Sequence, residues 1–187
     1  MSEPRAPLSA PREVEIVQLL ASDIHRYEGR PADGPRFVSG VELRESLEFR
    51  AGRGIVGDRY FNERAHRHAS VTFQAVESLE AIERELALDE TPGLRQTRRN
   101  ILLRGVDIDT MRGTDFSLDS GDGPVLFRAN RPANPCAWMD VAIAPGAFPA
   151  LRRRGGMRCE PLGDGVLRVG RAVLRSTLEP AAASVLF

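Results

Sequence analysis

The residue with the most distinctive chemical setting is Cys136, in the segment Arg131-Pro132-Ala133-Asn134-Pro135-Cys136-Ala137-Trp138-Met139-Asp140. Each proline biases the residue before it away from helix, so we expect an extended chain up to the cysteine. A thiol that leaves such a stiff loop, with arginines nearby, is suited to act as a nucleophile or as a soft-metal ligand. The alternative is that Cys136 is a small buried apolar side chain, as free cysteines usually are. Cys159 lies between apparent strand residues, and we expect it to be structural.

A second segment that could bind a ligand is Arg95-Gln96-Thr97-Arg98-Arg99-Asn100, directly before the apolar run Ile101-Leu102-Leu103. If the segment is a strand, Arg98 and Asn100 project to one face and Arg99 to the other. That face would present a guanidinium fork, suited to phosphate, beside an amide that both donates and accepts hydrogen bonds. The alternative is a solvated edge strand that its arginines keep soluble.

Three other patterns carry less weight. Gly52-Arg53-Gly54-Ile55-Val56-Gly57 matches G-x-G-x-x-G, but residues 58–64 lack the apolar helical face that a dinucleotide-binding turn must open, so we reject that interpretation. His66 and His68 would share a face of an extended chain, but no third ligand stands at a recognisable spacing, which favours surface positions. Arg152-Arg153-Arg154 could clamp an anion, although a charged loop is the simpler interpretation.

The elements that position these residues are mostly short strands. One helix is expected over residues 74–88, where Val76, Leu79, Ile82 and Leu86 recur at helical spacing. The turn segments 120–124 and 163–165 are each expected to close a β-hairpin. Apolar runs predict strands at residues 14–20, 37–52, 101–103, 116–118, 125–127, 166–169 and 172–174. Many short strands and few helices predict a mainly β fold with a few helices (α+β), built as a barrel or a sandwich.

Composition narrows the class of protein. The 187 residues suit one domain, which we place at residues 13–187 after a flexible tail at residues 1–12. The 26 basic and 26 acidic residues balance, and every basic residue except three histidines is an arginine, so no net field attracts nucleic acid. Two cysteines are too few for a disulfide scaffold or an iron-sulfur cluster. No apolar run approaches the length that spans a membrane and no signal pattern begins the chain, so we expect a cytoplasmic protein.

Taken in order, these segments resemble the MOSC domain, named after the C-terminal domain of molybdenum cofactor sulfurase. Gly54-Ile55-Val56-Gly57-Asp58-Arg59-Tyr60 looks like the family's G-x-x-G-D-R stretch, and Arg98-Arg99-Asn100-Ile101 looks like its arginine-and-asparagine strand. Pro135-Cys136 stands where the family keeps its cysteine, and Leu167-Arg168-Val169-Gly170 resembles its closing hairpin. Two positions depart from the pattern: Tyr60 stands where a histidine is common, and Arg171 replaces the usual acidic residue.

The resemblance implies a β-barrel like that of the pyruvate kinase β-barrel domain, and a molybdenum cofactor (molybdenum-molybdopterin) as its ligand. It implies that Cys136 ligates the metal and that Arg98 and Asn100 contact the pterin or its phosphate. Asp58 and Arg59 would shape the pocket, and Arg99 and Arg131 would add cofactor-binding guanidinium groups. The family includes the bacterial YiiM protein and enzymes that reduce N-hydroxylated compounds.

The leading hypothesis is therefore a molybdenum-dependent oxidoreductase in which Cys136 is the catalytic thiolate and the substrate is a small N-hydroxylated compound. The chain has no flavin or nicotinamide motif, so a separate reductase is expected to supply electrons. The second hypothesis is a non-catalytic carrier of the cofactor or of cysteine-bound sulfur. The third is a plain anion-binding barrel in which both cysteines are structural.

Overall fold

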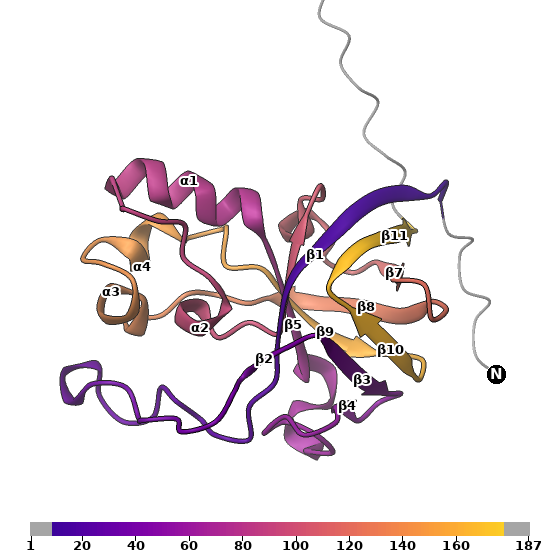
Figure 1. Ribbon diagram of the computed structural model, residues 1–187, viewed down its shortest axis with the longest axis horizontal. Coiled ribbons are helices and arrows are strands. Elements are labelled where there is room, and N and C mark those ends of the chain that lie inside the picture. Colours follow the sequence, from indigo (N-terminus) through magenta and orange to yellow (C-terminus); the bar gives the residue numbers. More distant parts are fainter. Residues whose placement is uncertain (1–8, 178–187) are drawn as a thin grey trace, which may run out of the picture.

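The computed structural model describes residues 9–177, and these residues form a closed barrel with a helical layer at one end (Figure 1). Strands β1, β11, β7, β8, β9, β5 and β6 pair in that order, and β6 returns to β1 to close the barrel. The predicted mainly β barrel is thereby confirmed. The strands of the barrel and its attached strand β2 are β1 (Arg12–Leu20), β2 (Leu43–Arg44), β5 (Val71–Ala75), β6 (Ile101–Arg104), β7 (Asp115–Asp119), β8 (Val125–Pro132), β9 (Met157–Pro161) and β11 (Gly170–Ser176).

A second, three-stranded sheet lies against the barrel, in the order β10-β3-β4. Its strands are β3 (Ser46–Arg50), β4 (Gly54–Ile55) and β10 (Gly165–Arg168). The G-x-G-x-x-G segment supplies its β3–β4 turn and opens no helix, which confirms that it is not a dinucleotide-binding turn.

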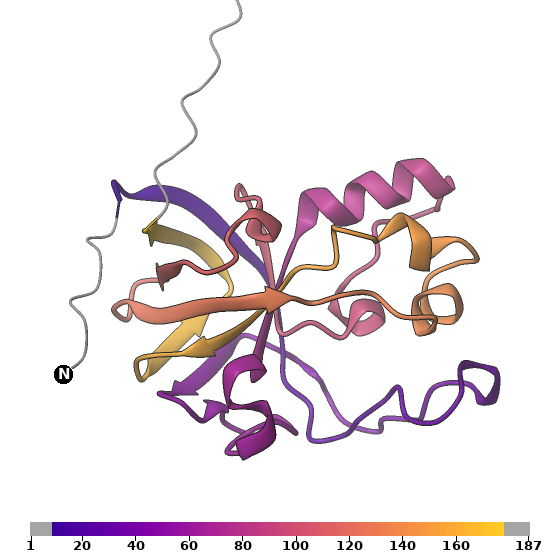
Figure 2. The same cartoon turned by 180° about the vertical axis from the view of Figure 1, so that it is seen from behind.

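The α-helices of residues 9–177 gather at the end of the molecule away from β7, β10 and β11, and both views of the ribbon show this separation (Figures 1 and 2). They are α1 (Val76–Leu86), α2 (Leu94–Thr97), α3 (Trp138–Ala142) and α4 (Ala147–Ala150). Helix α1 confirms the predicted long helix, because Val76, Leu79 and Ile82 are buried on one face. Short 3₁₀ helices cover Pro31–Asp33, Arg64–Ala69 and Ile108–Thr110.

The barrel interior is filled by side chains. Phe49, Phe73, Phe116 and Phe127 are fully buried, and their ring centroids lie 5.0–5.4 Å apart in edge and stacked contacts. A second apolar cluster lies under the helices and includes Leu20, Leu79, Leu94 and Trp138. The packed interior leaves no room for a ligand inside the barrel, so a ligand would have to bind outside it.

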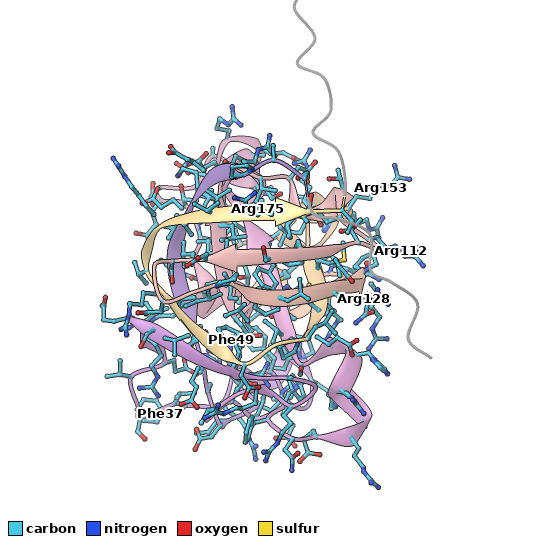
Figure 3. All side chains as sticks on the ribbon, turned by 90° about the vertical axis from the view of Figure 1, so that its right-hand side faces the viewer. Phe37, Phe49, Arg112, Arg128, Arg153 and Arg175 are labelled. Atoms are coloured by element: carbon cyan, nitrogen blue, oxygen red, sulfur yellow. The ribbon has the colours of Figure 1, made fainter. Side chains whose placement is uncertain are left out.

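Several local expectations fail. The turn at residues 163–165 joins no hairpin, because β9 belongs to the barrel while β10 pairs with β3. The same change of sheet separates β10 from β11, so residues 167–170 form no closing hairpin. Residues 37–42 are not a strand, and Phe37 stays 86% exposed at the edge of the molecule (Figure 3). By contrast, the turn at residues 120–124 does join the antiparallel pair β7 and β8.

Residues 1–8 of the expected tail lie outside the described residues. Arg12 begins β1, and the Ser9 backbone N–H donates to the Ser176 carbonyl oxygen at 2.6 Å. Among residues 9–177, no helix is long and apolar enough to cross a bilayer.

Candidate functional site

The segment before β6 is not the strand that the sequence suggested. Residues Leu94–Thr97 form α2, and Arg98 caps it in the left-handed conformation, with φ 58° and ψ 31°. The Arg98 backbone N–H donates to the Leu94 carbonyl oxygen at 2.8 Å. Strand β6 begins only at Ile101, so Arg98 and Asn100 do not share a strand face.

Arg98 is buried against a carboxylate that sequence reasoning missed. Its Nη1 and Nη2 atoms donate to the two carboxylate oxygens of Glu42 at 2.7 and 2.6 Å. Burial acts to raise the pKa of Glu42, but the hydrogen bonds from Arg98 and Ser22 outweigh burial and leave this pKa below its ordinary value. The pair fixes the end of the 21–42 segment to α2. Both terminal nitrogens of the Arg98 guanidinium are therefore already bonded to Glu42.

All hydrogen-bonding groups of the Asn100 side chain also have protein partners. Its Oδ1 accepts from the Thr72 backbone N–H at 2.9 Å and from the Thr72 hydroxyl at 2.8 Å. Its Nδ2 donates to the Leu20 carbonyl at 3.1 Å and to Asp58 Oδ2 at 3.2 Å. Because an amide offers two donors and two acceptors, none is left over for a ligand. Asn100 and Asp58 thus join the end of β1, the start of β5 and the 56–62 turn into one buried support.

Arg99 reaches toward the loop that carries Cys136. Its guanidinium donates to the Ala133 carbonyl at 2.6 Å, to the Gly155 carbonyl at 2.8 Å and to the Thr97 carbonyl at 3.1 Å. The pKa of Arg99 is lowered to about 10, chiefly by burial and also by the charges of Arg158 and Arg59, while the Cys136 and Asp109 charges act to raise it. Its hydrogen-bond acceptors are all main-chain oxygens, so Arg99 fixes the 133–136 loop without having its positive charge neutralised by a carboxylate.

Cys136 is exposed at the start of α3, where its carbonyl oxygen accepts from the Met139 backbone N–H at 2.9 Å. The alternative of a buried apolar cysteine therefore does not hold for Cys136. It does hold for Cys159, which is fully buried in β9, and burial raises the pKa of its thiol well above the ordinary value.

Four guanidinium groups form an electrostatic cluster: Arg158 interacts with Arg59 and Arg131, and Arg99 interacts with Arg158 and Arg59. Cys136 interacts with two of them, Arg99 and Arg158. We call Arg59, Arg99, Arg131 and Arg158 the arginine cluster. Arg131 and Arg158 are register partners on β8 and β9. Burial lowers the pKa of Arg158, and the charges of Arg131 and Arg59 lower it further, while the Tyr60 and Cys136 charges raise it. Sequence reasoning missed Arg158, since nothing in a single sequence reveals that it lies beside Arg131.

The arginine cluster is short of counter-charge. Within the described part of the chain, Arg59 Nε and Nη1 are buried without hydrogen-bond partners, and the nearest carboxylate oxygen, Asp58 Oδ2, lies 4.0 Å from Nη1. The Arg59 guanidinium instead stacks over the Tyr60 ring, 4.6 Å from its centroid. Arg158 forms no ion pair with any carboxylate of residues 9–177. Such an arrangement is stabilised by a bound anion.

The two histidines form no metal site. His66 packs on Tyr60, with centroids 4.3 Å apart, and exposed His68 hydrogen-bonds Glu160 through Nδ1. In residues 9–177, no three His, Cys, Asp or Glu side chains gather in a way that could hold a metal ion. A metal at Cys136 would need its other ligands from a cofactor.

The predicted charged run 152–154 is partly paired, because Arg154 forms an ion pair with Glu85.

Comparison with known proteins shows the fold. No protein-family model matches the sequence, and no curated protein matches it. The structure is similar to the YUAD protein from Bacillus subtilis (TM-score 0.67, 14% identity, 92% of this chain and 100% of that chain). It is also similar to YiiM from Geobacillus stearothermophilus (TM-score 0.56, 14% identity, 91% and 78%) and to YiiM from Escherichia coli (TM-score 0.55, 11% identity, 89% and 71%). The chain therefore has the fold of these proteins, which is the fold that the resemblance to MOSC domains implies.

Proposed function

We propose that this protein binds a molybdenum cofactor between Cys136 and the arginine cluster. The observation that carries the proposal is the combination of an exposed thiol with buried guanidinium nitrogens of Arg59 that lack partners. Molybdopterin ends in a phosphate monoester, which guanidinium groups bind well, and its metal takes a soft sulfur ligand. The donor set on the protein thus fits both ends of the cofactor.

In this proposal the residues have different roles. Cys136 would ligate the metal, while Arg59, Arg131 and Arg158 would bind the phosphate. Arg99 would add charge and hold the 133–136 loop. Asp58, Arg98 and Asn100 would support the site without contacting the ligand, because their polar groups already bond to other protein groups. This differs from the role that the resemblance implies for Arg98 and Asn100.

When bound, the cofactor would supply two-electron redox chemistry that removes oxygen from a small N-hydroxylated substrate as water. The residues near it would orient the substrate and exclude solvent. The electrons would come from a separate reductase, because the chain carries no electron-relay motif of its own. The expected location remains the cytoplasm, where the thiol stays reduced.

The experiment that tests the oxidoreductase is an assay on protein produced in a host that makes the cofactor. Reduction of an aromatic hydroxylamine by a chemical electron donor should require Cys136 and be lost in Cys136→Ser. Bound molybdenum without turnover would contradict the oxidoreductase and favour the carrier.

A further inference from the structure

We propose that Tyr27 is a positioning residue that holds the chain beside Cys136 in place and so restrains its thiol. Tyr27 lies in the segment between β1 and β2, which runs along the helical end of the molecule (Figure 2). Its consequence for cofactor binding rests on the proposed function, but the contacts that carry it do not.

The first contact is with α3. The ring of Tyr27 stacks on the indole of Trp138, with centroids 5.0 Å apart and planes 10° from parallel. Trp138 is the first residue of α3 and stands two residues after Cys136. It is 7% exposed, so Tyr27 covers its ring. An aromatic pair of this geometry is stabilising beyond the area that it buries.

The second contact is with α2. The Tyr27 hydroxyl donates to the Gln96 carbonyl oxygen at 2.5 Å. Arg99, three residues further on, binds the Ala133 carbonyl on the other side of Cys136. The residues before and after the thiol are therefore both anchored to segment 96–99, one through Arg99 and the other through Tyr27.

The third observation concerns the segment that carries Tyr27. Its far end is fixed to the same part of the chain by the buried pair of Glu42 and Arg98. The segment is thus tied to α2 at its end and to both α2 and α3 at Tyr27. Burial raises the pKa of Tyr27 to about 12, so its hydroxyl remains a hydrogen-bond donor even in alkaline solution, where an ordinary tyrosine ionises.

The test is the alkylation rate of each cysteine by iodoacetamide, at one pH, on protein without cofactor. Tyr27→Phe keeps the stack and loses the hydrogen bond, so Cys136 should react about fivefold faster. Tyr27→Leu loses both contacts, and its rate should rise about tenfold or more. Buried Cys159 should stay unreactive in both variants, which shows that the barrel is intact.

Phe61→Leu is the matched control, because Phe61 is another partly buried aromatic residue and contacts Arg53 rather than α3 or the arginine cluster. Wild-type rates in both Tyr27 variants, or an equal rise in Phe61→Leu, would overturn the proposal. If Tyr27→Leu exposes Cys159, Tyr27→Phe alone decides, and a wild-type Cys136 rate then overturns it. The readout needs no metal, so failure of the proposed function leaves this result readable.

Discussion

At the scale of single residues, the site is defined by which arginines are paired and which are not. Arg98 has a buried carboxylate partner in Glu42, whereas Arg158 has none among residues 9–177. A paired, buried guanidinium supports structure, and an unpaired one is stabilised by an incoming anion. The two classes of arginine should therefore respond differently to substitution.

Glu42→Gln tests the structural class. It leaves the buried Arg98 charge without a carboxylate, so the free energy of unfolding at pH 7 should fall by about 3–5 kcal/mol in urea denaturation. Glu45→Gln is the control: this carboxylate is exposed, and its change should stay within about 0.5 kcal/mol. Equal stability of the two variants would contradict the role of the pair.

The same pair predicts a pH dependence. The pKa of Glu42 is lowered in the folded state, so its stabilisation is present above the unfolded pKa of about 4.3 and is lost as the pH falls through the folded value. The wild type should therefore lose stability more steeply than Glu42→Gln on acidification below about pH 4.3. Parallel pH profiles would count against this assignment.

Arg158→Gln tests the ligand-binding class. It removes a charged donor, so inorganic phosphate should bind more than about tenfold more weakly, as measured by calorimetric titration. Stability should change little, because no carboxylate is left unpaired. Arg175→Gln, on the exposed face of β11, is the control and should bind phosphate like the wild type (Figure 3).

At the scale of elements, the position of Cys136 depends on a close approach between two loops. A Cβ atom on Gly155 would lie 2.3 Å from the Ala133 carbonyl oxygen and 3.1 Å from Pro135 Cδ. The 133–136 loop can therefore pack here only against a glycine, and Arg99 ties the two loops together through Ala133 and Gly155.

Gly155→Ala should displace the Cys136 loop. Overpacking of this kind costs about 1–3 kcal/mol of unfolding free energy, and bound molybdenum should fall with it. Gly40→Ala is the control, because a Cβ at Gly40 meets nothing within 4 Å. Normal molybdenum content in Gly155→Ala would show that the loop need not be held there.

Element type was predictable where local signals were strong. The helical spacing of Val76, Leu79 and Ile82 and the β7–β8 turn appear as predicted. Residues 94–97, by contrast, form a helix, and Arg98 ends this helix in the left-handed conformation. The side chain of Arg98 is held there by Glu42, which is distant in sequence. Single-sequence periodicity contains no information on such a partner.

At the scale of the whole molecule, aromatic rings fill the interior of the barrel, and Cys136 lies outside it at the start of α3. Many short strands indicated a barrel or a sandwich, but closure depends on the pairing of β1 with β11, near opposite ends of the chain. Cys136, Arg59, Arg99 and Arg131 could be named from the sequence because of their setting or resemblance. Arg158 could not, since only the β8–β9 register brings it to Arg131.

The central claim is that the Cys136 thiolate holds molybdenum. Elemental analysis of protein from a cofactor-competent host, wild type beside Cys136→Ser and Cys159→Ala, tests it most directly. The account predicts molybdenum in the wild type and in Cys159→Ala, and its loss in Cys136→Ser. Equal molybdenum in wild type and Cys136→Ser, or none in any of the three, would contradict it.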